Sequence, residues 1–324
     1  MQAVIVAEAG GPEVLEVREQ QDPEPGPGEV RVAVAACGVN FIDIYQRSGA
    51  YPMSTPFLAG SEGAGEVTAV GSGVTDIAVG DHVAWAMVPG GGYATAVVVP
   101  AERTVPVPAT VDDETAAAVM LQGMTAHFLC ESTYPVRAGD DVLLHAGAGG
   151  VGLLLTQLIA TKGGRVLATT STPAKAELAR GTGAAEVIAY TEMDVVAEVR
   201  RLTHGEGVAV VYDGVGRATF SASLDSLRPR GMLVLFGAAS GPVEPVDPQT
   251  LNRKGSLFLT RPSLPHYIST REELLWRAKA VFDAVAAGRL DVRIGARYSL
   301  AEAGRAHEDL AGRLTTGKSL IIPG

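Results

Sequence analysis

Three glycines, Gly147, Gly149 and Gly152, form the pattern G-x-G-x-x-G within the stretch DVLLHAGAGGVGLLLTQLIA. Such glycines let the backbone approach a pyrophosphate closely, and the start of a following helix then holds its charge. About half a match is expected by chance in a chain with 39 glycines among 324 residues, so the pattern alone decides nothing. Its placement does, because an apolar strand ends at Ala146 and a leucine-rich helix follows. We therefore expect a dinucleotide-phosphate site rather than a purely structural turn, at Gly149, Gly150, Val151 and Gly152.

A second phosphate-binding pattern lies near the C-terminus. The stretch GRLTTGKS, residues 312–319, matches G-x-x-x-x-G-K-[ST]. A nucleoside triphosphate loop follows a strand and leads into a helix, whereas this one follows a helical stretch and runs into LIIPG. We therefore reject the NTPase interpretation and expect Lys318 to begin a last strand. Arg313, just outside that strand, remains a candidate for contact with an anionic cofactor.

The end of the second strand after the glycine motif indicates which dinucleotide is bound. In an NAD site an acidic residue there binds the ribose 2′-hydroxyl. Here the stretch reads ATTSTPAKAEL, which offers Ser171 and neighbouring threonines, with Lys175 in the next helix. Hydroxyls and an ammonium suit a 2′-phosphate, so we predict NADPH, although Glu177 is able to pair with Lys175 instead. Tyr190, which ends the third strand, is a candidate neighbour of the adenosine or simply a cap of the sheet.

Composition excludes several classes of protein. A net charge of −10 argues against a nucleic-acid partner, since that affinity depends on clustered Lys and Arg. Cys37 and Cys130 are the only cysteines and lie far apart in sequence, which excludes a disulfide framework or a cysteine-rich metal site. The N-terminal stretch lacks a basic segment and a long apolar run, and no stretch of about 18 apolar residues occurs. We expect a cytoplasmic protein with no membrane partner.

The predicted elements that position these residues form two regions with different patterns of secondary structure. Up to about residue 100, short strands alternate with glycine- and proline-rich turns, which is typical of a small barrel-like β domain. The predicted strands are QAVIVAE, VLEVREQ, EVRVAVAACG, GEVTAVG, DHVAWAM and YATAVVVP. Within this part, residues 40–49 (NFIDIYQRSG) are predicted to form a short helix whose Phe41, Ile42, Ile44 and Tyr45 face an interior.

The second region, in which strands alternate with helices, begins after a predicted helix at DDETAAAVMLQGMTAHFLCES. Five strands, DVLLHA, RVLATTS, EVIAY, AVVYDGV and GMLVLFG, alternate with helices that begin near Gly150, Pro173, Met193 and Ala218. This alternation predicts an α/β fold, a doubly wound parallel sheet with helices on both faces. The last sixty or so residues add SLFLT, a long helix at STREELLWRAKAVFDAVAAG and a final strand KSLIIPG.

The sequence resembles the zinc-free quinone oxidoreductases of the medium-chain dehydrogenase/reductase superfamily, the zeta-crystallin-like group. The segments that carry the resemblance span nearly the whole chain: GGPEVLEV, GVNFIDIYQRSGAYP, GSEGAGEVTAVGSGV, LQGMTA, HAGAGGVG, VVYDGVG and NRKGSLFLTRPSL. It implies a GroES-like β-rich catalytic domain built from residues 1–122 and 266–324, and a Rossmann domain at 123–265. It also implies a homodimer.

Zinc-dependent members of that superfamily hold a catalytic metal with Cys, His and a third Cys or acid. The corresponding positions here are Asn40, Ser61 and Leu121. An amide, a hydroxyl and an alkyl chain do not make the thiolate and imidazole set that zinc requires. None of the six histidines, His127 and His145 among them, stands in a metal-binding spacing. We expect no metal.

Without a Lewis acid, reduction of a simple ketone is difficult, whereas hydride addition to a quinone gives a delocalised hydroquinone anion. The expected reaction is hydride transfer from NADPH to a quinone or another electrophilic acceptor. By resemblance, Asn40, Ile42, Asp43 and Tyr45 line the nicotinamide and substrate end of the site. Asn40 is the polar positioning group, and Tyr45 is the proton donor or quinone-oxygen partner unless it is only a core residue. Tyr51 is a weaker candidate at the mouth.

The resemblance also implies further cofactor contacts. One set lies around Phe41 and in the helix before the Rossmann domain, where Phe128 replaces an aromatic residue that commonly carries a hydroxyl. The other set follows the later strands, where Ala238 replaces a residue that is often polar. The contacts implied are Phe41, Thr125, Phe128, Gly214, Phe236, Gly237, Ala238, Ala239, Pro262, Ser263 and Leu264.

Two other functions stay open at this point. One is NADPH-dependent reduction of an activated C=C bond in an enone or enoyl-thioester, which uses the same hydride geometry. The other is a non-catalytic NADPH-binding protein with a structural or sensor role. A preference for alkene acceptors over quinones would indicate the first alternative. The absence of turnover with any acceptor, despite NADPH binding, would indicate the second.

Overall fold

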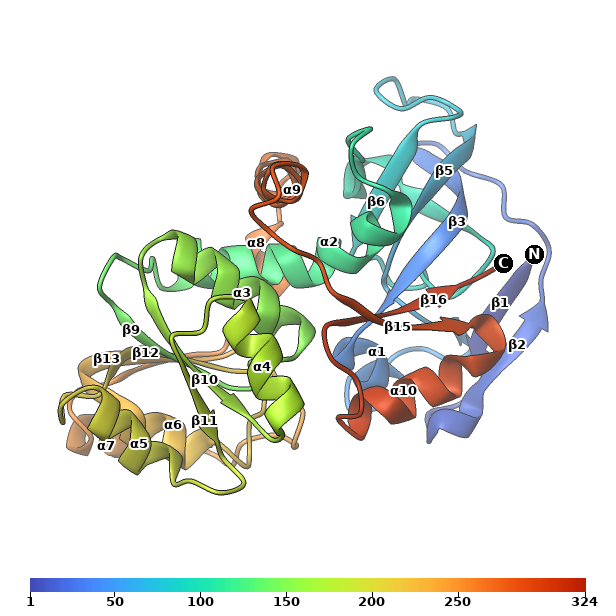
Figure 1. Ribbon diagram of the computed structural model, residues 1–324. Coiled ribbons are helices and arrows are strands. Elements are labelled where there is room, and N and C mark those ends of the chain that lie inside the picture. The colour runs from blue at the N-terminus through green and yellow to red at the C-terminus, as the bar shows by residue number, and fades with distance from the viewer. The chain divides into compact units, whose positions relative to one another are not determined.

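The protein consists of two units, one of which is assembled from both ends of the chain. The computed structural model describes all of residues 1–324, and the first unit comprises Met1–Met124 and Tyr267–Gly324. The second unit is the continuous stretch Thr125–His266. Figure 1 shows the blue N-terminal strands and the red C-terminal strands in one and the same unit. Helix α2 (Asp113–Phe128) begins in the first unit and ends in the second.

The first unit is built on a seven-stranded sheet. Along the sheet the order is β15-β16-β3-β5-β6-β8, and β7 pairs with β3. Alternation explains β3, whose Val30, Val32 and Val34 are buried while Ala33 and Ala35 are exposed. The strands are β3 (Glu29–Val39), β5 (Glu62–Val70), β6 (His82–Ala86), β7 (Ala96–Pro100), β8 (Thr104–Pro106), β15 (Ile294–Ser299) and β16 (Lys318–Ile322). A three-stranded sheet joins β1 (Gln2–Val6), β2 (Leu15–Glu19) and β4 (Phe57–Leu58).

Several helices complete the first unit. They are α1 (Phe41–Arg47), α9 (Arg271–Ala286) and α10 (Ala303–Ala311), with short helices at Pro12–Val14, Ala101–Arg103 and Leu300–Glu302. The core of this unit contains the fully buried rings of Trp85 and Tyr93 together with Tyr298. Helix α1 begins directly after β3, at the position predicted from the NFIDIY stretch, and this short connection places its residues beside the interior of the sheet.

The second unit is a six-stranded parallel sheet with the order β11-β10-β9-β12-β13-β14. Counted from β9, this is the 3-2-1-4-5-6 order of a Rossmann fold, as predicted. The strands are β9 (Asp141–Leu144), β10 (Arg165–Thr170), β11 (Glu186–Ala189), β12 (Val208–Asp213), β13 (Leu227–Leu235) and β14 (Phe258–Thr260). The connecting helices are α3 (Gly150–Thr161), α4 (Pro173–Gly181), α5 (Val195–Leu202), α6 (Phe220–Ser226) and α7 (Pro248–Arg253). A π-helical turn, Leu129–Thr133, follows α2, and α8 (Leu264–Tyr267) ends the unit.

The observed elements differ from the predicted ones in a few places. Helices α5 and α6 each begin two residues after the predicted Met193 and Ala218. Strand β15 was not predicted, because it is a short edge strand whose alternating Ile294, Ala296 and Tyr298 are interrupted by a glycine. Lys318 begins β16 as expected, and the chain after it pairs with β3 and β15 instead of forming the helix that an NTPase loop needs.

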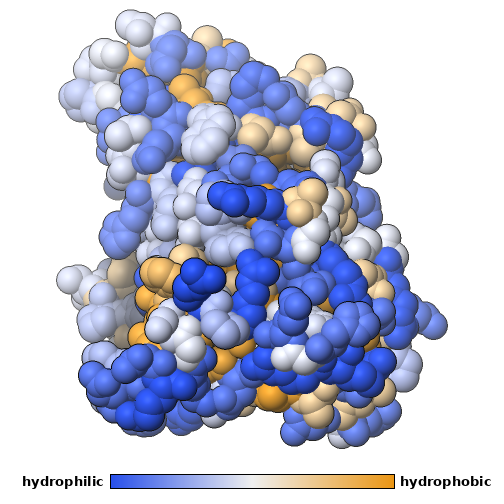
Figure 2. Space-filling model, turned by 90° about the vertical axis from the view of Figure 1, so that its left-hand side faces the viewer, coloured by the Kyte–Doolittle hydropathy of each residue, from blue (hydrophilic) through white to orange (hydrophobic).

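Hydrophilic side chains cover much of one face of the molecule. Figure 2 shows one face, on which hydrophilic residues predominate and hydrophobic residues form small groups between them. The helices are too short or too polar for any of them to traverse a lipid bilayer.

Candidate functional site

The predicted dinucleotide contacts of the second unit follow the carboxyl ends of its six strands. Gly149–Gly152 follow β9, Ser171 follows β10 and Tyr190 follows β11; Gly214, Phe236–Ala239 and Pro262–Leu264 follow β12, β13 and β14. Because all six strands are parallel, these segments share one edge of the sheet. In open sheets of this kind, ligands bind outside the carboxyl ends, where the strand order reverses, here between β9 and β12.

The glycine-rich loop has the form of a phosphate cradle. Helix α3 begins at Gly150, and its N-cap residue, Gly149, supplies no side-chain hydrogen bond, so the first N–H groups of the helix have no capping partner. A Cβ atom on Gly147 would lie 2.7 Å from the Cβ of Ala168, and one on Gly152 would clash with the carbonyl oxygen of Ala146. The tight path of the loop therefore requires these two glycines, and a pyrophosphate fits the open helix terminus.

The end of β10 also suits the predicted cofactor. The hydroxyl of Thr170 is buried and has no hydrogen-bond partner in the protein, and Ser171 beside it is half-buried. Thr172 caps α4 by accepting a hydrogen bond from the backbone N–H of Lys175, at 3.3 Å. Tyr190 is 39% exposed, and its backbone N–H donates to Thr170 O at 3.2 Å. The end of β10 and the start of α4 offer hydroxyls and an ammonium to a phosphate, and β10 does not end in a carboxylate.

The turns after β12 and β13 pack against each other. A Cβ atom on Gly214 would lie 2.9 Å from the ring of Phe236, and one on Gly237 would lie 2.5 Å from the carbonyl oxygen of Gly214. The backbone N–H of Ala239 donates to Gly214 O at 3.2 Å. Gly214, Phe236, Gly237, Ala238 and Ala239 thus form one half-buried surface at the carboxyl edge.

The turn after β12 is fixed by Asp213, a fully buried residue that the sequence analysis did not single out. Its Oδ1 atom accepts the N–H groups of Val215 and Gly216 at 2.8 and 3.0 Å. Its Oδ2 atom accepts the hydroxyls of Thr219 and Ser223, both at 2.7 Å. A carboxylate at the end of an otherwise apolar strand was the available signal, because a buried charge needs such partners.

In the first unit, the predicted residues of α1 divide into a buried and a more accessible group. Asn40 and Asp43 are buried, at 4% and 3% exposure. The Tyr45 and Tyr51 rings lie 5.1 Å apart between centroids, and Tyr51 is 44% exposed. The Phe41 ring lies 6.1 Å from that of Tyr45. The rings of Phe41 and Tyr45 on α1 and of Tyr51 beyond its end therefore form a continuous group, while Asn40 and Asp43 are buried.

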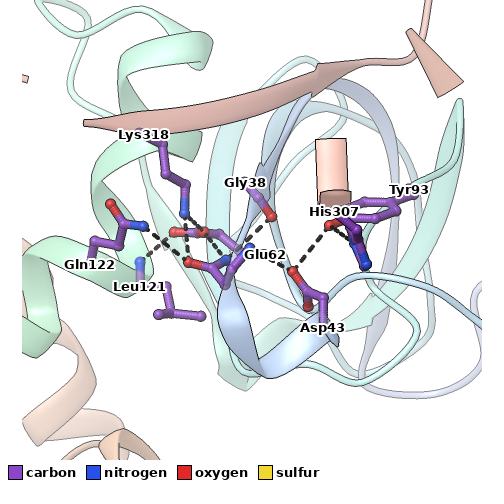
Figure 3. A network of polar contacts seen from close by, with 9 residues as sticks. Gly38, Asp43, Glu62, Tyr93, Leu121, Gln122, His307 and Lys318 are labelled. Atoms are coloured by element: carbon purple, nitrogen blue, oxygen red, sulfur yellow. Dashed lines mark hydrogen bonds and ion pairs between the residues drawn. The ribbon is translucent and has the colours of Figure 1, made fainter. Parts of the chain in front are cut away.

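The Asn40 amide is held inside a buried polar network (Figure 3). Its Nδ2 atom donates to Glu62 Oε2 at 2.8 Å and to the carbonyl oxygen of Gly38 at 3.3 Å. Its Oδ1 atom accepts from Lys318 Nζ at 2.8 Å and from Gln122 Nε2 at 3.4 Å. With both N–H groups and the carbonyl engaged, the side chain is held in one orientation directly before α1.

An ion pair forms the centre of this network. Lys318 Nζ lies 2.5 Å from Glu62 Oε2, and the two side chains are 2% and 0% exposed. The second oxygen of Glu62 accepts the backbone N–H of Leu121. Asn40 and Leu121 are two of the positions where zinc-dependent relatives are expected to hold their metal, so a lysine ammonium occupies this region. The third position, Ser61, donates its hydroxyl to Gln46 Oε1 at 3.4 Å.

Asp43 continues the network on its other side. Its Oδ2 atom accepts from the backbone N–H of Asn40 at 2.8 Å and from the hydroxyl of Tyr93 at 3.1 Å, while Oδ1 has no partner. Tyr93 is also 3.0 Å from His307 Nε2. Burial raises the pKa of Asp43 to about 7, and the Asn40 N–H and Lys318 oppose this shift. Burial lowers the pKa of His307 to about 3, with a further contribution from Arg47, so the imidazole is neutral.

The remaining predicted residues lie at the end of α2, at the start of α8 and after α10. Thr125 and Phe128 are buried in the last turns of α2, and Leu264 is buried in α8. Ser263 is exposed. Arg313 is exposed just after α10 and has a positive φ of 59°. No group of His, Cys, Asp and Glu side chains has the arrangement of a metal site.

Comparisons with known proteins agree over nearly the whole chain. Residues 26–109 match the family described as alcohol dehydrogenase GroES-like domain, and residues 150–273 match the family described as zinc-binding dehydrogenase. The chain is 50% identical to a quinone oxidoreductase of Pseudomonas aeruginosa over 97% of both proteins. It is 42% identical to a 2-haloacrylate reductase of a Burkholderia species, over 99% of this chain and 98% of that protein. The crystal structure of an Escherichia coli quinone oxidoreductase in complex with NADPH superimposes with a TM-score of 0.97 at 42% identity, over 100% of both chains.

Proposed function

Because the chain belongs to the quinone oxidoreductases of the medium-chain dehydrogenase/reductase superfamily, we propose that it reduces quinones by metal-free hydride transfer from NADPH. The observation that carries this proposal is the full-length identity of 50% to a quinone oxidoreductase. The Asn, Ser and Leu at the expected zinc-ligand positions support the metal-free part, since these residue types do not bind zinc.

We propose that the carboxyl edge of the second unit holds NADPH. The N–H groups at Gly150, Val151 and Gly152 bind the pyrophosphate, and Ser171 and Lys175 bind the 2′-phosphate. The turns at Gly214 and at 236–239, together with 262–264 and Tyr190, complete the contacts on the edge. Three residues that do not belong to this edge of the sheet are also proposed to contact NADPH: Thr125, Phe128 and Arg313. When bound, NADPH supplies the hydride.

The residues of α1 are proposed to serve the quinone and the nicotinamide. Hydride addition to a quinone leaves an oxyanion that requires one proton to become the hydroquinone. We propose that the Tyr45 hydroxyl donates this proton or a hydrogen bond to that oxygen, and that Phe41, Ile42 and Tyr51 contact the rings. Asn40 and Asp43 are proposed to position the other residues of α1 without donating a proton themselves, because their polar atoms are buried in the network of Figure 3.

Steady-state kinetics with two classes of acceptor test this function. With NADPH saturating, we expect kcat/KM for 1,4-benzoquinone and naphthoquinones to exceed that for enones and crotonyl-thioesters. We expect Tyr45→Phe to reduce kcat about 100-fold, the contribution of a positioned proton donor, with a small change in the KM for NADPH. A preference for the alkenes would replace the proposed substrate class, and no turnover with any acceptor despite NADPH binding would indicate a structural or sensor role.

A second candidate activity is the reduction of an activated C=C bond. The 42% identity to a 2-haloacrylate reductase over nearly the full chain favours it specifically. Hydride addition to the β-carbon of a conjugated acid or ketone also places charge on an oxygen, so the same α1 residues suffice. Including 2-chloroacrylate among the acceptors decides between the two activities by kcat/KM.

We propose that the protein works as a homodimer. The edge strand β14 supports this, because an edge strand exposes backbone N–H and C=O groups that pair with a second strand. Phe258 on β14 is 57% exposed, unusual for a large apolar ring. Light scattering coupled to gel filtration is expected to give twice the chain mass for the native protein, and the monomer mass for Phe258→Asp.

We also propose a cytoplasmic location. Both cysteines, Cys37 and Cys130, are buried free thiols, as suits a reducing compartment. Fractionation of cells with an antibody to the protein tests this location.

A further inference from the structure

A chain of buried hydrogen bonds crosses the second unit beneath its carboxyl edge. His145, which directly follows β9, has its Nδ1 atom 3.1 Å from the hydroxyl of Thr169 on β10. Its Nε2 atom lies 3.0 Å from the hydroxyl of Ser223 on α6. That hydroxyl in turn donates to Oδ2 of Asp213, at the end of β12. The four residues are each at most 3% exposed.

The chemistry of the end groups fixes the direction of every bond in this chain. Asp213 only accepts, so the Ser223 hydroxyl donates to it and must accept the Nε2–H proton of His145. His145 Nδ1 then carries a lone pair, which accepts the hydroxyl proton of Thr169. Burial lowers the pKa of His145, in agreement with a neutral imidazole. The chain is therefore saturated, with one donor and one acceptor at each link.

This chain connects three segments that carry proposed cofactor contacts. His145 precedes the glycine-rich loop, whose Gly147 N–H donates to Thr169 O at 3.0 Å. Thr169 is next to Thr170 and Ser171 at the strand end that selects NADPH. Asp213 holds the turn at Gly214–Gly216 through two N–H groups. The chain thus crosses between β9 and β12, where the strand order reverses.

We propose that Thr169, His145, Ser223 and Asp213 are positioning residues for NADPH, which set the three loops in their binding arrangement before the cofactor arrives. Four polar side chains beneath the carboxyl edge of an apolar sheet are costly to bury, and apolar residues of similar size would pack there without needing partners. A pre-organised loop loses less conformational entropy on binding, so the network lowers the Kd for NADPH without touching the cofactor. This inference rests on the proposed placement of NADPH at the carboxyl edge.

The test compares two serines on the same helix. Ser223→Ala removes the central link of the chain, whereas Ser226→Ala removes a buried hydroxyl that only donates to Ala222 O within α6, at 2.7 Å. Kd for NADPH is measured by titration calorimetry, and amide hydrogen exchange of residues 145–152 and 213–217 is measured without cofactor. We expect Ser223→Ala to weaken NADPH about tenfold, as for loss of a hydrogen bond to a charged group, and to speed exchange in both segments. Ser226→Ala should leave both quantities within about twofold of the native protein.

A second variant covers the case in which Ser223→Ala does not fold. Thr219→Val removes the other hydroxyl bound to Asp213 Oδ2 while keeping the shape of the side chain. We expect it to weaken NADPH and to speed exchange at 213–217 more than at 145–152. Native Kd and exchange in both variants, or equal losses in the Ser226→Ala control, would overturn the inference while leaving the proposed function intact. Absence of NADPH binding by the native protein would overturn both.

Discussion

Lys318 and Glu62, which are 256 residues apart in the sequence, form an ion pair with Nζ and Oε2 separated by 2.5 Å in the interior of the first unit. Lys318 is the lysine of the phosphate-loop pattern GRLTTGKS, and its burial excludes the role that the pattern suggests. The pair instead holds the Asn40 amide at the start of α1. The same cation lies beside Asn40, one of the positions where zinc-dependent members of the superfamily are expected to hold a metal, and its charge repels a divalent ion.

Removing one member of this pair should destabilise the protein strongly. In Lys318→Met the Glu62 carboxylate loses its cation in an apolar interior, and we expect the free energy of unfolding to fall by about 3–5 kcal/mol. Urea denaturation followed by circular dichroism measures this change. Lys279→Met, which breaks an exposed pair with Asp283, is the matched control and should cost less than about 1 kcal/mol. The double variant Lys318→Met/Glu62→Gln should recover part of the loss, and a neutral effect of Lys318→Met would contradict the buried pair.

The raised pKa of Asp43 should make its contribution to stability depend on pH. Its folded value of about 7 exceeds its ordinary value of 3.8, so between these values the folded protein binds more protons than the unfolded chain. Stability therefore falls as pH rises through this window, at up to about 1.4 kcal/mol per pH unit. Asp43→Asn removes this pH dependence. Between pH 5 and pH 7.5, we therefore expect the difference in the free energy of unfolding, variant minus native, to rise by more than about 1 kcal/mol.

His307 changes the pH dependence of stability in the opposite direction to Asp43. Its pKa of about 3 lies below the ordinary 6.5, so its contribution is lost as pH falls between these values. Urea titrations at several pH values for native protein, Asp43→Asn and the exposed control Glu177→Gln separate the two terms. A parallel pH dependence of the native protein and Asp43→Asn would show that Asp43 titrates normally.

The preference for NADPH over NADH should depend on Lys175. We expect Lys175→Met to raise KM for NADPH about 10- to 100-fold, the effect of losing a charged hydrogen bond to phosphate, and to leave KM for NADH within about twofold. Arg180→Met, at an exposed position later in α4, is the control. Equal losses with both cofactors would assign Lys175 to the stability of α4 rather than to the 2′-phosphate.

Metal removal should have no effect. Dialysis of the native protein against EDTA is expected to leave quinone reduction unchanged, because Asn40, Ser61 and Leu121 offer no zinc ligands and Lys318 supplies a cation beside Asn40. Elemental analysis of the purified protein provides the independent measurement. One tightly bound zinc per chain would sink this interpretation.

Local patterns predicted the fold because they depend on periodicity. The strand, glycine loop and helix around Gly149 lie where the sequence indicates, and α1 begins at Phe41 as expected. Strand β15 escaped prediction because it is a short edge strand in which Gly295 interrupts the alternating series of Ile294, Ala296 and Tyr298. A glycine inside a strand weakens the sequence signal, and the strand is defined by its pairing with β16.

The polar networks were beyond reach of the sequence for another reason. Lys318, Glu62 and Asn40 meet only because β16, β5 and the end of β3 are brought together, and no spacing in the chain records this. Likewise His145, Ser223 and Asp213 lie on three different elements. His145 was interpreted as a core or surface residue, and the structure shows it buried. What the sequence did not indicate was that its two nitrogens link neighbouring loops.

The position of β16 in the middle of the first sheet has a consequence for the newly made chain. β16 lies between β15 and β3, and its residues 319–321 pair with 37–39 at the very start of α1. Until β16 has been synthesised, residues 37–39 of β3 lack this partner and Glu62 has no cation, whereas residues 29–33 already pair with β7. The second unit, whose strands are all encoded before residue 261, is complete much earlier. The second unit is therefore synthesised in full before the first, whose residues 1–124 lack β16 until late in synthesis and form the kind of incomplete unit that chaperones protect.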